Sequence, residues 1–282
     1  MLGKLMKYEM KSIYKYFLTL YAIIIIGAIM SLTTARTQVA ILEKIGIGSF
    51  VACFVACIAL GVVQFIFTIT RFNTSLLGDE GYLMFTIPTS THTVIWSKAL
   101  VLLIFNILST IVVAGAFVMI FLVSATVSAN KIDPKGIEFI HNVFKYPGVY
   151  LGIIVTIVSV LVSIIDMIFL IYASLSFGQL PGLKKHKNIF AFAFFIVFNT
   201  ASTYLYTVIS KDSTQALIDK FETASAQNID ASATTAQMGE RVGLVVDFIS
   251  KLQVGLIVST VIEIAVLYAI TYYILNRKLN LD

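Results

Sequence analysis

Two acidic residues stand inside apolar runs of this chain. Asp166 lies within residues 149–178, and Glu263 lies within residues 252–275. A carboxyl group at the centre of a bilayer costs about 2.5–3.5 kcal/mol on insertion scales, so it must pair, become protonated or take part in transport. Both acids are therefore candidates for a substrate or proton path. The structural alternative is that they bond serines or each other between packed helices.

Three amide side chains share this apolar setting: Gln64, Asn106 and Asn199. They too are candidates for a substrate path through the membrane. Amides in membrane helices more commonly form hydrogen bonds between helices, each worth about 1 kcal/mol or less. The sequence alone does not separate these two roles.

Enzyme chemistry finds little support in the sequence. A chain that hydrolyses nucleotides needs a phosphate-binding loop of the form GxxxxGKS or GxxxxGKT, and this chain has none. The stretch SLSFGQ at 174–179 faintly echoes a signature of ATP-hydrolysing subunits, but it ends an apolar run and is interpreted as chance. His92, His141 and His186 fall on three different loops, without an HExxH pattern. We therefore expect no catalytic residue, no metal, no cofactor and no enzyme activity in this chain.

The elements that must position these side chains are membrane spans. Hydrophobic residues make up 59% of the 282 residues and charged residues 12%, about half the usual share of a soluble domain. Six apolar runs are each long enough for a membrane-spanning helix: about 16–32, 48–70, 99–126, 149–178, 189–209 and 252–275. Backbone groups in lipid must be satisfied within each segment, and the alternation of a membrane barrel is absent. The sequence predicts an all-α integral membrane protein with a single transmembrane domain over residues 1–282.

Small residues indicate where helices approach one another. The second run carries them at four-residue spacing: Ser49, Cys53, Cys57 and Gly61. Gly148 and Gly152 form a shorter example in the fourth run. Such spacing is typical of close helix packing, and it indicates no chemistry.

Residues 1–13 predict an amphipathic helix that lies in the membrane interface. Apolar side chains fall on one face of this helix and its extension into the first span: Leu2, Leu5, Met6, Met10, Ile13 and Phe17. Four lysines fall on the opposite face, at Lys4, Lys7, Lys11 and Lys15, where they would meet anionic headgroups. The alternative is an ordinary basic flank of the first span.

The basic residues also predict the orientation of the chain. With both termini in the cytoplasm, the inner segments hold eleven Lys and Arg against four acids, while the outer loops hold nine of each. This bias accounts for the net charge of +5 and the pI near 9.1 without a nucleic-acid partner. We expect a multi-pass protein of the cell membrane. Residues 210–251 would form an extracellular loop with a polar middle and two short amphipathic helical flanks.

The cytoplasmic loop 71–98, RFNTSLLGDEGYLMFTIPTSTHTVIWSK, is the most distinctive stretch. It holds two adjacent acids between glycines, and it exposes Leu, Tyr, Met and Phe together. Such a loop can form a short helix parallel to the membrane that offers a compact surface to a cytosolic partner. The alternative is a plain connecting loop.

At this loop the sequence resembles the permease subunits of type-2 ABC exporters of Gram-positive bacteria. The residues that carry the resemblance are Gly78, Glu80, Gly81, Tyr82, Leu83, Thr86, Pro88, Ser97 and Lys98. The opening LMKYEMKSIYKYF and the end ILNRKLNLD also look like that family. Ile87, where a leucine is more usual, is a minor departure.

The resemblance implies a coupling helix that binds a groove of a separately encoded ATPase. The contact would be made by Leu77, Gly78, Asp79, Glu80, Gly81, Tyr82, Leu83 and Met84. Two permeases, identical or related, and two ABC ATPase subunits would form the working unit in the lipid membrane, with ATP and magnesium bound by the ATPases. The substrate route would lie between the two permeases, near spans two and five. The implied cargo is amphipathic or hydrophobic, such as an antimicrobial peptide or a lipid-like compound.

Two other functions fit the same layout. A proton-coupled secondary transporter would use Asp166 and Glu263 and would need no ATPase. A non-transporting sensor or assembly component would use the amphipathic terminus and the inner loop to bind a partner.

Overall fold

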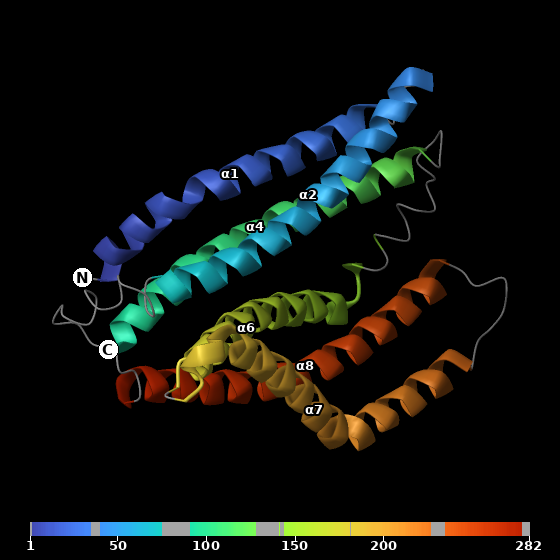
Figure 1. Cartoon of the computed structure of the whole chain (residues 1–282). Coiled ribbons are helices and arrows are strands. Elements are labelled where there is room, and N and C mark those ends of the chain that lie inside the picture. Colours follow the sequence, from blue (N-terminus) through green and yellow to red (C-terminus); the bar gives the residue numbers. More distant parts are fainter. Residues whose placement is uncertain are drawn as a thin grey trace. The chain divides into compact units, whose positions relative to one another are not determined.

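A computed structural model describes residues 2–34, 40–74, 91–127, 141, 144–180, 182–226 and 235–277. The long helices in these residues are α1 (Leu2–Thr34), α2 (Ala40–Phe72), α4 (Thr91–Val127), α6 (Pro147–Gly178), α7 (Lys187–Ala226) and α8 (Thr235–Arg277). A short 3-10 helix, η2 (Lys184–His186), precedes α7 (Figure 1). The described residues contain no strand, which confirms the all-α prediction.

Six of the described helices contain a stretch long and apolar enough to cross a membrane. These stretches are Met6–Ser31, Lys44–Phe72, His92–Ile120, Gly148–Gly178, Lys187–Lys211 and Phe248–Asn276. Each overlaps one of the six predicted runs, which confirms that the six runs form helices long and apolar enough to span a membrane. The third stretch begins earlier than expected because α4 runs unbroken through its single lysine, Lys98. The chain has the layout of a multi-pass membrane protein.

α1 is a single helix that joins the predicted interfacial segment to the first span without a break. Ile13 and Phe17 are buried, whereas Lys7, Lys11 and Lys15 are exposed. Met10, which was predicted on the same face as Ile13 and Phe17, is exposed, and the placement of this helix in the membrane interface stays a prediction. 

The segment 210–251 is helical at both ends. α7 continues to Ala226 and α8 begins at Thr235, so each predicted amphipathic flank prolongs a span. α7 bends along its length (Figure 1). Thr203 and Thr207 each donate a hydrogen bond to the carbonyl four residues earlier, at 2.9 and 2.8 Å, a contact that often bends helices.

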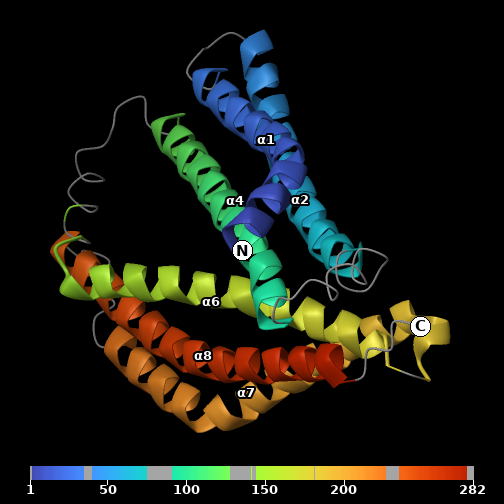
Figure 2. The same cartoon turned by 90° about the vertical axis from the view of Figure 1, so that its left-hand side faces the viewer.

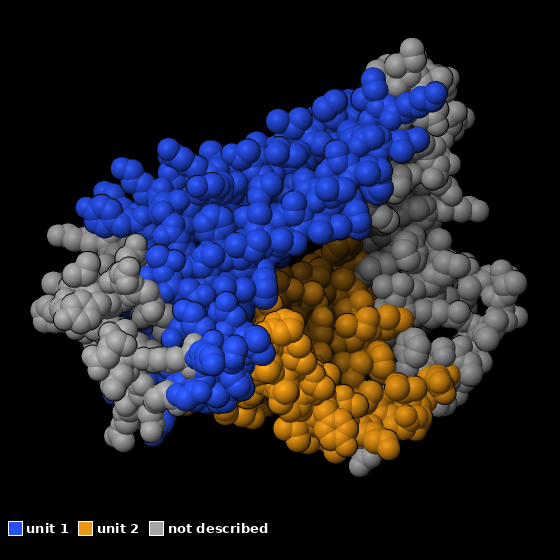
Figure 3. Space-filling model, in the orientation of Figure 1, with its two compact units in different colours: residues 1–131, 171–191, 270–282 blue, residues 132–170, 192–269 orange. Residues whose placement is uncertain are grey.

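The chain forms two compact units, coloured separately in Figure 3. Unit 1 comprises residues 1–131, 171–191 and 270–282, and unit 2 comprises residues 132–170 and 192–269. Unit 1 thus contains all of α1, α2 and α4, together with the end of α6, the start of α7 and the end of α8.

In unit 1, α1 packs against both α2 and α4, as both views of the chain show (Figures 1 and 2). Phe17 lies at the centre of this packing, with its ring centroid 4.8 Å from that of Phe105 and 5.6 Å from that of Phe67. Gly27 lets α1 and α2 approach, because a Cβ added there would lie 3.3 Å from the Cβ of Cys53. Part of the predicted small-residue stripe therefore faces α1. Gly61 does not, since nothing lies within 4 Å of its added Cβ.

The turn from α6 to α7 depends on two glycines. At Gly178 an added Cβ would meet the carbonyl oxygen of Lys187 and would lie 3.1 Å from the Cβ of Ala191. Gly182 has a φ of +103°, a left-handed conformation that other residues rarely adopt. The glycine of the SLSFGQ stretch thus has a packing role at a helix end.

In unit 2, α8 contacts both α6 and α7. Thr156 Oγ1 of α6 donates a hydrogen bond to Gln253 Oε1 of α8 at 3.1 Å. Val246 of α8 packs so closely on Gly152 that a Cβ at this glycine would clash with it. This contact gives Gly152 the packing role that its spacing predicts.

Candidate functional site

The predicted site residues fall into three groups. The proposed coupling residues, Leu77 to Met84, lie outside the described residues. Gln64 and Asn106 belong to unit 1, whereas Asp166, Asn199 and Glu263 belong to unit 2.

The two intramembrane acids lie near each other in unit 2. Ser202 Oγ of α7 donates a hydrogen bond of 2.5 Å to Glu263 Oε2 of α8. Asp166 of α6 is within electrostatic range of Glu263. Its Oδ1 atom is buried and has no hydrogen-bond partner among the described residues. Glu263 thus accepts a hydrogen bond from a serine, which is the contact expected if these acids have a structural role. Asp166 has one acceptor atom that no described residue uses.

The three amides do not link helices within the described part of the chain. Asn106 Nδ2 donates to the carbonyl oxygen of Leu102 on its own helix, at 2.9 Å. Gln64 Nε2 is buried without a hydrogen-bond partner among the described residues. The Asn199 side chain is exposed. Interhelical polar contacts come from other residues, such as Tyr21, whose hydroxyl donates to the carbonyl oxygen of Phe105 at 3.1 Å.

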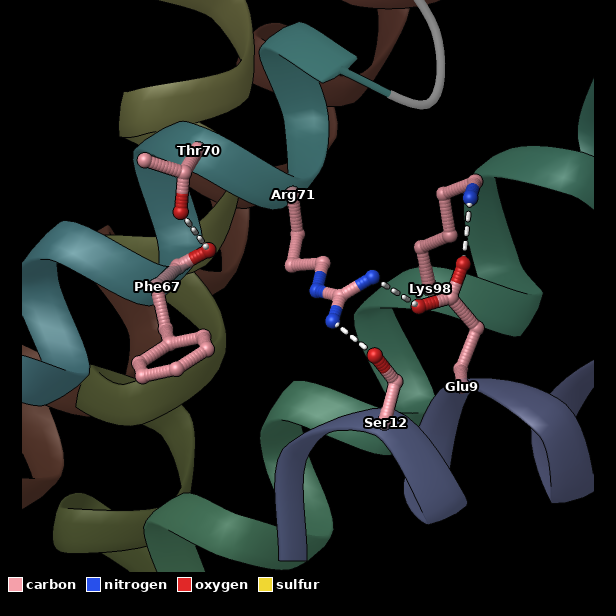
Figure 4. A network of polar contacts seen from close by, with 6 residues as sticks. All are labelled: Glu9, Ser12, Phe67, Thr70, Arg71 and Lys98. Atoms are coloured by element: carbon pink, nitrogen blue, oxygen red, sulfur yellow. Dashed lines mark hydrogen bonds and ion pairs between the residues drawn. The ribbon is translucent and has the colours of Figure 1, made fainter. Parts of the chain in front are cut away.

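A charged cluster in unit 1 joins α1, the end of α2 and the start of α4. Glu9 Oε1 of α1 accepts a hydrogen bond from Lys98 Nζ of α4 at 2.7 Å. Glu9 Oε2 lies 3.6 Å from Arg71 Nη1 of α2, and Arg71 Nη2 donates to Ser12 Oγ. Figure 4 shows the Glu9 carboxylate between the two cations. We call Glu9, Ser12, Arg71 and Lys98 the Glu9 cluster.

Burial makes the Glu9–Lys98 pair the core of this cluster. The Lys98 side chain is 3% exposed and the Glu9 side chain 15%, whereas that of Arg71 is 26% exposed. Lys98 lies in the buried stripe of α4, which contains Val94, Ile95, Val101, Leu102 and Phe105. A buried cation needs a paired and hydrogen-bonded anion, and Glu9 supplies it.

An aromatic residue of α6, Tyr172, lies beside the Glu9 cluster. Tyr172 is wholly buried and lies within electrostatic range of Glu9. Its ring centroid lies 4.2 Å from that of Phe72, the last residue of α2. The end of α6 thus packs against the end of α2 beside the cluster.

The sequence contained a signal for Glu9 that hydropathy alone does not use. On a helix of 3.6 residues per turn, Glu9 falls on the apolar face with Met6 and Ile13, away from the lysines. An acid on the buried face of an amphipathic helix requires a cationic partner. The identity of that partner depends on which helices adjoin α1, and the sequence did not give this.

No metal-binding group was found among the described residues, where no three His, Cys, Asp or Glu side chains come together. His92 instead stacks on Tyr272, with ring centroids 4.0 Å apart.

Comparison of the chain with protein-family models, with curated proteins and with solved structures gave no match.

Proposed function

We propose that this chain is the membrane-spanning permease subunit of an ABC exporter. Separately encoded ATPase subunits, in two copies, bind its cytoplasmic loop 71–98 and hydrolyse ATP with magnesium. A second permease, identical or related, completes the pathway in the cell membrane, with both termini of this chain in the cytoplasm. The cargo belongs to the amphipathic or hydrophobic class that includes antimicrobial peptides and lipid-like compounds.

The observation that carries the proposal is the inner loop. Its residues Gly78, Glu80, Gly81, Tyr82 and Pro88 resemble those of such permeases. A chain with six candidate spans and no phosphate-binding loop needs a separate source of energy for active transport.

The Glu9 cluster gives the proposal a physical basis. The chain itself joins the loop to α2 and α4. Arg71 of α2 and Lys98 of α4 both form ion pairs with Glu9 of α1. A force that a partner applies to the loop would therefore act on three helices of unit 1.

Purification of the tagged chain from its native membranes in mild detergent tests this proposal. We expect an ABC ATPase to co-purify, with ATP hydrolysis that responds to the cargo. Asp79→Ala together with Glu80→Ala should abolish coupled hydrolysis and export. Asp219→Ala with Glu222→Ala removes two exposed acids from α7 and serves as the matched control. Intact coupling in the loop variant would refute the coupling assignment.

The polar group of unit 2 favours a second candidate, a proton-coupled secondary transporter. Glu263, bonded to Ser202 and within electrostatic range of Asp166, could exchange a proton during transport. This candidate predicts uptake or efflux driven by a pH gradient in vesicles without any ATPase. Glu263→Gln should abolish that movement, whereas ATP-driven export should survive the same substitution.

A further inference from the structure

The loop segment 75–90 is bracketed by two cations that share one carboxylate. Arg71 stands four residues before this segment and Lys98 eight residues after it. Both interact with Glu9, through different oxygen atoms, Lys98 at 2.7 Å and Arg71 at 3.6 Å. Glu9 of α1 therefore links the two flanks of the segment through ion pairs.

The charge balance of the cluster makes Arg71 and Lys98 both depend on Glu9. Two cations, Arg71 and Lys98, face one anion, Glu9. Without its charge, Arg71 and Lys98 would repel each other across the gap that Glu9 occupies. Water cannot replace the lost partner at Lys98, because that side chain is almost fully buried.

We infer that Glu9 is a positioning residue that holds the two flanks of segment 75–90 to each other and to α1, so that α1, the end of α2 and the start of α4 move as one body. Ser12 strengthens the attachment on the α2 side, because it accepts a hydrogen bond from Arg71 in addition to the Arg71–Glu9 ion pair. The extension of this inference to transport rests on the proposed permease function. If that function holds, α1 helps to transmit the motion of the ATPase to the membrane spans.

Hydrogen exchange of the full-length protein in lipid nanodiscs tests the inference without any partner. In Glu9→Gln, amide exchange should accelerate by about tenfold or more in both flanks, residues 68–74 and 91–97, because a charge-assisted bond is lost on each side. Glu9→Asp keeps the charge and should restore most of the protection. Lys15→Gln changes one charge on the exposed face of α1 and should leave both flanks unchanged.

Arg71→Gln supplies a second variant that keeps the Glu9–Lys98 pair intact. It should accelerate exchange at residues 68–74 alone, so it tests the inference even if Glu9→Gln does not fold. Exchange in Glu9→Gln within about twofold of the wild type at either flank would overturn the inference. Equal acceleration of amide exchange in both flanks of Arg71→Gln would also overturn the inference, because Arg71 and not Glu9 would then hold the two flanks together.

A functional measurement separates this inference from the proposed function. In the complex with an ABC ATPase, Glu9→Gln should retain ATP hydrolysis but lose most of the transport per ATP, and Glu9→Asp should recover it. If no ATPase binds the wild-type chain, the proposed function fails while the exchange results still decide the role of Glu9. If the complex forms and Glu9→Gln transports normally per ATP, the extension to coupling fails.

Discussion

Replacing Glu9 with methionine should destabilise the protein far more than replacing Lys98 with methionine, although the two residues form one pair. In Lys98→Met, Glu9 keeps Arg71 at 3.6 Å and the cluster becomes neutral. The variant loses one charge-assisted hydrogen bond, worth about 1.5–3 kcal/mol. Methionine among the buried apolar side chains of α4 offsets part of that loss. We expect a net cost of about 1 kcal/mol.

Glu9→Met has the opposite effect on the cluster. It leaves the ammonium group of Lys98 with 3% exposure and no anion, beside a second cation. Removal of one partner from a buried pair costs about 3–5 kcal/mol. Because Glu9 is 15% exposed and Arg71 26%, we expect the lower end of that range, about 3 kcal/mol. The double variant Glu9→Met/Lys98→Met should cost about as much as Lys98→Met, since no buried charge is left unpaired.

Unfolding by SDS in mixed micelles measures these differences. The chain's one tryptophan, Trp96, stands two residues before Lys98 and gives a fluorescence signal from the same helix. Lys11→Met, at an exposed lysine of α1, is the control and should stay within about 0.5 kcal/mol of the wild type. Equal costs for Glu9→Met and Lys98→Met, or a double variant as unstable as Glu9→Met, would refute the reasoning.

Three further predictions concern packing and polar contacts inside the spans, all measured by the same unfolding assay. Gly27→Leu should cost about 1–3 kcal/mol, because its Cβ would already lie 3.3 Å from a neighbour on α2, whereas Gly61→Leu, in open space, should be neutral. A neutral Gly27→Leu would contradict the α1–α2 packing. Tyr21→Phe should cost about 0.6–1.7 kcal/mol, since its hydroxyl bonds α4 at 2.8 and 3.1 Å. Glu263→Gln should leave stability unchanged or raise it, because glutamine still accepts the serine bond and no longer repels Asp166; a clear loss would show that the charge itself is required.

The spans were predictable because length and composition decide them. A run of about 20 apolar residues has few alternatives to a membrane helix. Helix ends were less predictable, because a helix continues past its apolar run wherever its backbone groups can still form hydrogen bonds. α4 thus begins at Thr91, and α7 extends to Ala226, well into the predicted outer loop.

Contacts between helices depend on which helices adjoin and in what register, and a single sequence specifies neither. Hydropathy identified Asp166 and Glu263 as acids that need partners, but the bond from Ser202 to Glu263 requires the register of α7 against α8. The same limit applies to Glu9. Its place on the apolar face of α1 indicates a buried partner, yet Lys98 is 89 residues away in the sequence.

ATP-driven movement of a probe in proteoliposomes tests the central claim most directly. The chain is reconstituted with its co-purifying ATPase, and the probes are a fluorescent phospholipid analogue and a labelled cationic amphipathic peptide. The permease account predicts that a probe moves only when ATP, magnesium and the ATPase are all present, and that Asp79→Ala with Glu80→Ala stops it. Movement driven by a pH gradient in vesicles that hold this chain alone would contradict the account.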